Sequence, residues 1–261
     1  MTDILRMLVR TAHDLVQAGY YDRGGQSCSR EAPSFAAALD AHPSFPLIAE
    51  VKVASPTRKR ISAHAPTDLI RLYKEGGAAG ISVVTEPRWF RGDLETLSDA
   101  ARSGLPVLMK DFVVDGRQIE AAKRLGASAV LLIEDAFEGP SAVQERESLV
   151  DLAHGLGLEV LLEAGNEGSL GRATRSMADL IGLNQRDLRS MSVDLDRGNR
   201  LLGHLRRGDR PAVVMSGINS RSQVESVRDA GAVAVLIGEA ASSSIDPCSF
   251  LRSLEVERRR R

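Results

Sequence analysis

From residue 45 onward the chain repeats one pattern eight times: a short, almost continuous apolar run followed by a polar stretch, which in most units has helical spacing. Apolar runs of this kind are typical of parallel strands that are buried on both faces. We expect strands at residues 47–52, 80–85, 106–110, 129–134, 158–163, 180–184, 212–215 and 233–237. Helices are predicted at residues 66–72, 94–102, 118–125, 141–156 and 220–230, mostly stopped by glycine. Eight such units favour an α/β fold of the closed (β/α)8 TIM-barrel type over a doubly wound open sheet.

The length of 261 residues fits one such barrel. No linker or change in composition divides the chain, so we expect a single domain over residues 1–261, with residues 1–45 as an N-terminal helical extension. Apolar spacing within residues 2–20 predicts a first helix with Thr2 or Asp3 as its N-cap, and Ser34 opens a second helix at residues 35–39. Two roles remain open for this arm: a cover on the bottom of the barrel, or a part of the active site.

Charge and composition exclude several classes of protein. The formal net charge of −1 gives no support for binding to nucleic acid or to a membrane surface. No apolar stretch reaches about 18 residues and there is no signal peptide, so we expect a cytoplasmic protein with reduced thiols. The two cysteines and five histidines lack metal-ligand spacing, which predicts no metal site. The basic run at residues 258–261 is interpreted as the solvated end of a last helix.

Polar residues follow most of the predicted strands. In barrels of this class the carboxyl ends of the strands converge on one mouth. The residues at those ends are Glu50, Lys52, Thr85, Glu86, Lys110, Asp111, Glu134, Glu163, Asn184, Arg186, Ser216, Gly217, Gly238 and Glu239. Two lysines and several carboxylates around one enclosed mouth would shift one another's pKa into a range useful for proton transfer. The pattern therefore predicts a site for acid–base chemistry.

Glycines follow the last two predicted strands, at Gly217 and Gly238. Backbone N–H groups at such turns can face an anion, and the loops after strands seven and eight are the usual phosphate site of this fold. We therefore expect a phosphorylated small molecule as the substrate.

Specific motifs near these strand ends resemble those of the indole-3-glycerol phosphate synthase family. The most specific segments are Ile48-Ala49-Glu50-Val51-Lys52 with Ser55-Pro56, Lys110-Asp111-Phe112, and Asn184-Gln185-Arg186-Asp187-Leu188. Further matches, in the same order as in the family, extend the resemblance over nearly the whole chain.

The resemblance implies a carboxy-lyase of tryptophan or specialised indole biosynthesis that uses no cofactor. It would convert 1-(2-carboxyphenylamino)-1-deoxyribulose 5-phosphate to indole-3-glycerol phosphate with loss of carbon dioxide and water. Lys110 would be the general acid that protonates the ketone oxygen, and Glu163 would handle the proton of the anilino intermediate. Lys52 and Glu50 would form a second acid–base pair, with Asn184 also catalytic. Ser55, Phe90, Phe112, Arg186 and Met215 would bind the substrate, and Ser216, Gly217, Gly238 and Glu239 the phosphate.

Four departures from the family pattern bear on this activity. Met215 stands where the family has a glutamate, and the loss of that carboxylate is expected to lower the pKa of a reacting lysine. Gly165 stands where a histidine is common, and Gln185 where asparagine or serine is usual. Residues 57–60 (Thr-Arg-Lys-Arg) lack the usual glycine, which predicts a stiffer and more basic loop. Two alternatives therefore stay open: altered chemistry on a related phosphorylated substrate, or a catalytically impaired homologue that binds a phosphorylated ligand or a partner protein.

Overall fold

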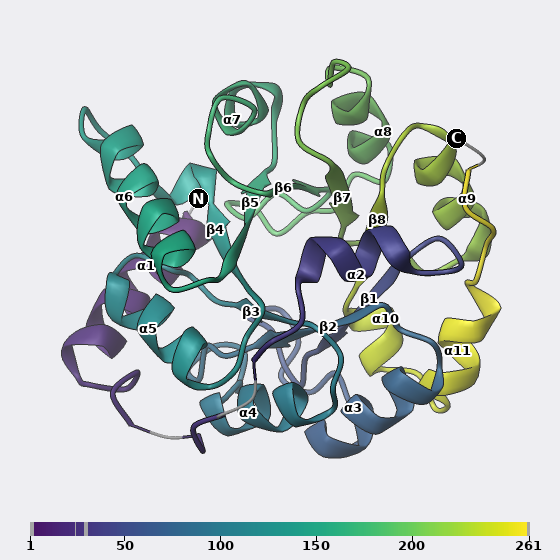
Figure 1. Ribbon diagram of the computed structural model, residues 1–261, viewed down its shortest axis with the longest axis horizontal. Coiled ribbons are helices and arrows are strands. Elements are labelled where there is room, and N and C mark those ends of the chain that lie inside the picture. The colour runs from purple at the N-terminus through teal and green to yellow at the C-terminus, as the bar shows by residue number, and fades with distance from the viewer. Residues whose placement is uncertain (1–2, 24, 29–30, 260–261) are drawn as a thin grey trace.

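Eight parallel strands close into a barrel in chain order, with β1 paired to β8 (Figure 1). The computed structural model describes residues 3–23, 25–28 and 31–259. The strands are β1 (Leu47–Val51), β2 (Gly80–Val84), β3 (Val107–Lys110), β4 (Ala129–Ile133), β5 (Glu159–Ala164), β6 (Leu180–Asn184), β7 (Ala212–Met215) and β8 (Ala234–Ile237). Every strand residue is buried except Lys110 and Glu159, which are half-buried. The predicted (β/α)8 barrel is confirmed.

An outer ring of helices covers the barrel (Figure 1). Its members are α3 (Pro66–Glu75), α4 (Leu94–Arg102), α5 (Gly116–Arg124), α6 (Ala142–Gly155), α7 (Glu167–Ala173), α8 (Arg197–Leu202), α9 (Arg221–Asp229), α10 (Glu239–Ser242) and α11 (Pro247–Ser253), with the short 3₁₀ turn η1 (Glu134–Ala136) after β4. All five helices predicted between the strands are present, as α3, α4, α5, α6 and α9. Helix α5 begins before the predicted residue 118 because Asp115 caps it and Gln118 completes a capping box.

Strand side chains alternate between two apolar clusters. One cluster lies between the strands and the helices and includes Ala49, Met109, Leu162 and Val214. The other fills the barrel and includes Ile48, Leu108, Leu161 and Val213. Two residues further along each of those four strands, the same inward parity is carried by Glu50, Lys110, Glu163 and Met215. These four side chains come from alternate strands, which is how a barrel of this class builds one layer of its interior.

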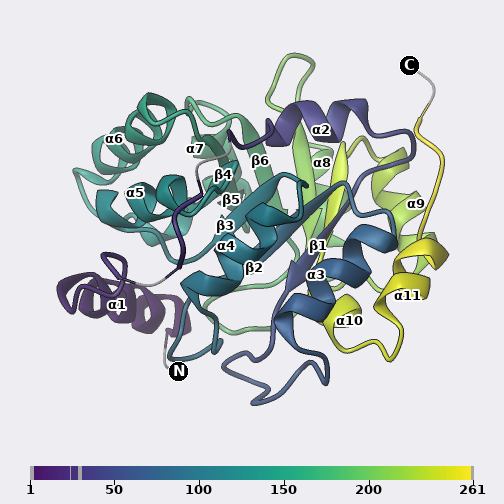
Figure 2. The same cartoon turned by 60° about the horizontal axis from the view of Figure 1, so that its bottom comes forward.

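The N-terminal arm divides between the two ends of the barrel, as Figure 2 shows. Helix α2 (Phe35–Ala41), capped by Ser34, lies at the bottom of the barrel, that is, at the amino-terminal ends of the strands. There the backbone N–H of Ala36 donates to Glu159 at the start of β5. Helix α1 (Ile4–Gln17), capped by Asp3, lies at the other end, where the indole N–H of Trp89 donates to Thr11 over 3.2 Å. Helix α2 thus takes the position of the bottom cover, whereas α1 lies at the mouth end without contributing a residue to the wall of the active-site cavity. The other predicted cap, Thr2, lies outside the described residues.

The basic C-terminal run does not end a helix, so that interpretation was wrong. Helix α11 stops at Ser253, and the chain then continues without helical structure. The Arg258 guanidinium donates to the carbonyl of Leu39 over 2.6 Å and also contacts the carbonyl of Asp40, at the C-terminal end of α2. The C-terminal segment thus holds helix α2 in place at the bottom of the barrel through Arg258. Residues 260–261 lie outside the described part of the chain.

Candidate active site

A cavity of about 310 Å³ opens at the carboxyl ends of the strands. All five residues predicted to be catalytic lie on its wall: Glu50, Lys52, Lys110, Glu163 and Asn184. Of the nine predicted binding residues, the wall includes Phe90, Phe112, Arg186, Met215, Ser216, Gly217, Gly238 and Glu239. Ser55 is not on the wall; its side chain is buried and its hydroxyl lies 3.3 Å from that of Thr57. Most of the residues that were predicted from their position at the carboxyl ends of the strands therefore line the same cavity.

Glu50 connects the two lysines of the mouth. Its side chain is 3% exposed, with Oε1 lying 3.6 Å from Nζ of Lys52 and Oε2 lying 3.7 Å from Nζ of Lys110. The Lys52 ammonium also lies 5.4 Å from the centre of the Phe90 ring. Burial lowers the pKa of Lys52, an effect that the charge of Glu50 opposes. A lysine in this environment gives up its proton more readily than a solvated lysine does.

Glu163 faces this cluster from β5 and is held in place by Asn184. Its Oε1 accepts a hydrogen bond of 2.6 Å from the side-chain amide of Asn184, whose own oxygen accepts from the backbone N–H of Arg186. No described residue donates a hydrogen bond to Oε2. Burial raises the pKa of Glu163, while Lys110 and the Asn184 hydrogen bond act in the opposite direction. A carboxyl group in this setting is suited to holding and releasing a proton.

Met215 completes the layer of four inward side chains that also contains Glu50, Lys110 and Glu163. It is 1% exposed and leans toward β6, because a Cβ placed on Gly182 would lie only 2.7 Å from its Cε. The layer therefore carries two carboxylates, one lysine and one thioether. The departure noticed in the sequence falls within the charged cluster itself.

The turn after β7 brings backbone groups to the cavity. Ser216 and Gly217 both have positive φ, 72° and 78°, and the side-chain amide of Gln185 holds the Ser216 carbonyl over 2.7 Å. Positive φ is uncommon for a serine, and this strained conformation is fixed by its surroundings. Gly238 then starts α10 beneath Glu50, where a Cβ would come 2.4 Å from the Glu50 carboxylate. These two turns form one end of the cavity.

Arg58 adds a cation at this end that the sequence had suggested only as a more basic loop. Its guanidinium pairs with the carboxylate of Glu239 at 2.8 Å, and both side chains line the cavity. The Glu239 side chain is therefore engaged by a cation.

Two strand-end carboxylates do not reach the mouth. Glu86 is fully buried and accepts the backbone N–H groups of Arg88, Trp89 and Phe90 over 2.7–2.9 Å, so it builds the loop that carries Phe90. Glu134 points away from the cavity and lies between two guanidinium groups. The expectation that both would face the mouth was wrong.

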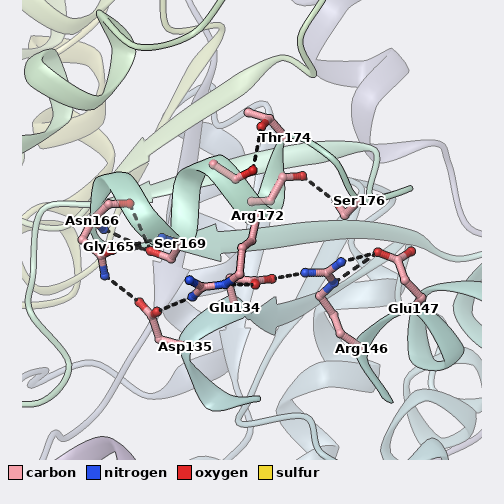
Figure 3. A network of polar contacts seen from close by, with 12 residues as sticks. Glu134, Asp135, Arg146, Glu147, Gly165, Asn166, Ser169, Arg172, Thr174 and Ser176 are labelled. Atoms are coloured by element: carbon pink, nitrogen blue, oxygen red, sulfur yellow. Dashed lines mark hydrogen bonds and ion pairs between the residues drawn. The ribbon is translucent and has the colours of Figure 1, made fainter. Parts of the chain in front are cut away.

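Figure 3 shows Glu134 between Arg146 of α6 and Arg172 of α7. Its two oxygens pair with these arginines at 2.5 and 2.7 Å. Arg172 also reaches Asp135 at 3.1 Å, and Asp135 in turn accepts from Asn166, the N-cap of α7. This network joins the loop after β4 to the helices on either side of it. Its role is to hold the wall of the barrel rather than to react.

Asp111 sits beside Lys110 but is bonded to the N-terminal arm. Its Oδ2 accepts from the Tyr21 hydroxyl over 3.0 Å and from the Thr85 hydroxyl over 2.6 Å, and its Oδ1 accepts from the backbone N–H of Phe112. Burial raises the pKa of Asp111 from 3.8 to about 6, although these hydrogen bonds oppose the rise.

The raised pKa of Asp111 predicts how stability changes with pH. Below pH 4 the carboxyl group is protonated in both states; between pH 4 and 6 only the unfolded state ionises, which lowers the free energy of unfolding. At about 1.4 kcal/mol per pKa unit, wild type should lose up to about 3 kcal/mol relative to Asp111→Asn between pH 4 and 7. Urea unfolding at several pH values measures this, with Asp151→Asn, at an exposed position, as the control for removing one carboxylate. The prediction would be contradicted if the free energies of unfolding of wild type and Asp111→Asn changed with pH in the same way.

Among the described residues no group of three or more His, Cys, Asp or Glu side chains is placed to hold a metal ion. Within the same ranges, no helix has the length and apolarity needed to span a membrane.

A closed (β/α)8 barrel with lysines and buried carboxylates at the carboxyl ends of its strands defines an enzyme of the acid–base type. Comparison with known proteins identifies the family. The family model described as indole-3-glycerol phosphate synthase matches residues 11–254, and the chain belongs to that family.

Curated relatives are similar over most of the chain. The indole-3-glycerol phosphate synthase of Roseiflexus sp. (strain RS-1) is 40% identical over 229 residues, which cover 84% of each protein. That of Burkholderia vietnamiensis (strain G4 / LMG 22486) is 36% identical over 261 residues, covering 96% of this chain and 98% of the relative.

Solved structures with low identity support the fold alone. A thiamine phosphate pyrophosphorylase from Pyrococcus furiosus aligns with a TM-score of 0.61 at 16% identity, covering 82% of this chain and 95% of the other. A mutant tryptophan synthase alpha-subunit, also from Pyrococcus furiosus, aligns with a TM-score of 0.59 at 14% identity, covering 82% of this chain and 98% of the other.

Proposed function

We propose that this chain is an indole-3-glycerol phosphate synthase. It converts 1-(2-carboxyphenylamino)-1-deoxyribulose 5-phosphate to indole-3-glycerol phosphate, carbon dioxide and water. The observation that carries the proposal is the cluster in one mouth: Glu50 within 4 Å of both lysines, with Glu163 facing them from β5. Family membership supports the same reaction.

The two ends of the cavity suit the two ends of this substrate. The phosphate lies at the turns after β7 and β8, where Gly217, Gly238 and Arg58 provide backbone N–H groups and a cation. The aromatic ring lies against Phe90 and Phe112, whose ring centres are 5.9 Å apart. Arg186 serves the ring carboxylate. This orientation places the ketone carbon beside the lysines.

Ring closure requires an acid at the ketone oxygen. The ring carbon that bears the carboxylate attacks the ketone carbon, and Lys110 donates a proton to the oxygen that becomes a hydroxyl. The ring is then cationic, so the electrons of the C–C bond to the carboxylate return to the ring as carbon dioxide leaves. The protein supplies positioning and proton transfer, while the substrate's own cationic ring accepts these electrons.

Dehydration completes the indole. The hydroxyl leaves as water after taking a proton from Lys52, whose lowered pKa makes it a stronger acid than a solvated lysine. Glu163 removes a proton from the CH2 carbon between the anilino nitrogen and the former ketone carbon, so that the C=C bond of the indole forms as water leaves and the nitrogen keeps its hydrogen. The raised pKa of Glu163 makes it a stronger base than a solvated carboxylate. Asn184 keeps Glu163 oriented throughout. Each group thus has a role that matches its electrostatic environment.

The decisive experiment is a direct assay with the carboxyphenylamino-deoxyribulose phosphate, following the fluorescence of the indole product. Turnover with release of one carbon dioxide per indole supports the proposal. Absence of indole at any pH would refute it. Binding of the unreacted substrate in that case would favour one of the two alternatives that Met215 suggests, altered chemistry or a catalytically impaired homologue.

Met215→Glu separates these possibilities. A carboxylate at this buried position would lie in the same layer as Lys110 and favour the charged form of a nearby lysine. If the chain is a working synthase, the basic limb of its kcat/KM profile should move up by about one pH unit in this variant. Met215→Gln, similar in size and uncharged, is the matched control and should leave the limb in place.

Other outcomes of this experiment have distinct meanings. If kcat/KM depends on pH in the same way in wild type, Met215→Glu and Met215→Gln, a charge at position 215 has no effect on the reacting lysine. Activity that appears only in Met215→Glu would identify the natural chain as catalytically impaired. Substrate binding without turnover in every variant would favour altered chemistry.

A further inference from the structure

A second cavity, of about 260 Å³, adjoins the active-site cavity behind Glu163. The two cavities share four wall residues: Ile133, Glu163, Arg186 and Leu188. The remaining wall of the second cavity includes Leu5, Asp135, Gly165, Asn166 and Arg200. Helix α1 contributes to this wall through Leu5, which is 2% exposed. The proposed reaction uses none of these further wall residues.

Gly165 is the reason why this space is open beside Glu163. It follows β5 directly, two residues after Glu163, and its backbone N–H is held by the Ser169 hydroxyl over 3.2 Å. A Cβ placed there would meet nothing nearer than Asp135 Oδ2 at 3.9 Å. Its φ is not in the left-handed region, so other residues can adopt this backbone. The space beside Glu163 is therefore open because Gly165 has no side chain, and not because its backbone conformation requires glycine.

The lining of the second cavity is mostly polar. Its boundary with the active site carries two apolar side chains, Ile133 and Leu188, and two charged ones, Glu163 and Arg186. Charged or amide side chains such as Asp135, Asn166 and Arg200 make up most of the remaining wall. Glu163 belongs to both cavities, and its Oε2 is buried without a hydrogen bond from any described residue. A buried carboxylate oxygen without a partner is costly, so a donor arriving here would be favoured.

We propose that this second cavity is a subsite for a polar substituent on the aromatic ring of the substrate. The inference rests on the proposed function, which places the ring against the apolar residues of the mouth. A ring hydroxyl directed past Ile133 and Leu188 would enter the cavity and could donate to the free oxygen of Glu163. The chain then accepts ring-hydroxylated carboxyphenylamino-deoxyribulose phosphates as substrates. A methyl group of similar size gains no such hydrogen bond and meets charged walls.

The test compares the parent substrate with versions that carry a hydroxyl or a methyl at each open ring position. At one position the hydroxylated compound should keep kcat/KM within about threefold of the parent, and the methylated compound should fall about tenfold or more below it. Discrimination of this size is ordinary where a site forms a hydrogen bond with one group and cannot form it with the other.

Gly165→Leu fills the cavity and tests whether the subsite is the cause. It should lower kcat/KM for the favoured hydroxylated compound by about tenfold or more and change that for the parent much less. Gly165→Ala should give a smaller effect in the same direction. Gly171→Leu is the matched control: Gly171 lies on α7, a Cβ placed on it would meet no atom within 4 Å, and it does not line the cavity.

The outcomes are separable from those of the proposed function. If the parent reacts but every hydroxylated compound is rejected at least as strongly as its methyl analogue, the subsite is refuted and the synthase activity stands. Equal losses for parent and hydroxylated substrates in Gly165→Leu would also refute it, as a general disturbance of Glu163. If the parent itself gives no indole with the wild-type protein, it is the proposed function that fails.

Discussion

Replacing Lys110 with methionine is expected to lower kcat by about 10²–10⁴-fold, the usual worth of one positioned proton-transfer group. Lys110 ends β3 on the inward face of the barrel, with its ammonium 3.7 Å from Glu50. Methionine keeps the apolar stem in place and removes the ammonium that we propose as the proton donor in ring closure. The free energy of unfolding should change less than in a variant that breaks a fully buried ion pair, because the Lys110 side chain is 22% exposed and Lys52 remains beside Glu50.

A matched control for Lys110→Met is Lys123→Met, which removes an exposed lysine from α5. Its kcat should equal that of wild type. Steady-state kinetics with the proposed substrate and urea unfolding of both variants provide the measurements. A Lys110→Met protein with more than a tenth of wild-type kcat would exclude this lysine as the principal acid.

Arg146→Leu is expected to destabilise the protein by about 3–5 kcal/mol, because it leaves the Glu134 carboxylate buried with one partner fewer. The Arg146 and Glu134 side chains are each 4% exposed, and their ion pair measures 2.5 Å. Arg172, the remaining partner, is 42% exposed and bonds the other oxygen of Glu134. Urea unfolding with linear extrapolation measures the loss.

The double variant Glu134→Leu/Arg146→Leu should recover part of this loss, because it also removes the orphaned charge. Arg71→Leu is the control: it breaks a pair with Glu75 in which the two side chains are 57% and 49% exposed, and it should cost less than about 1 kcal/mol. If Arg146→Leu costs no more than Arg71→Leu, the network in Figure 3 does not hold the wall as described.

The sequence predicted the barrel because its eight strands are buried on both faces and leave nearly unbroken apolar runs. The bounds of β6 and β7 and of α4 were predicted to the residue. The helices α7, α8, α10 and α11 were not assigned, since segments of four to seven residues span at most two turns and show no clear apolar period. The division of the arm between two ends of the barrel depends on contacts far apart in the chain and had no local signal.

The position of the predicted residues at the mouth agrees with the structure where strand parity and strand ends point the same way. Glu50, Lys110 and Glu163 share the inward parity of the apolar residues two positions before them. Glu134 follows the inward residue Ile133 directly, so alternation alone would have turned it away from the mouth. Glu86 has the parity of the inward residue Val84, and its absence from the mouth results from the three backbone N–H groups that it accepts in its own loop. The second cavity could not be read from the sequence as a shape, although the unusual Gly165 marked its position.

Gly238 ties two parts of the site together. The Glu50 carboxylate, held between two lysines, occupies the space that any side chain at position 238 would need. The same residue forms the turn at the proposed phosphate end. A side chain introduced at position 238 to alter the proposed phosphate end would therefore also displace the carboxylate that lies between the two lysines, so this position cannot be redesigned for one end of the site alone.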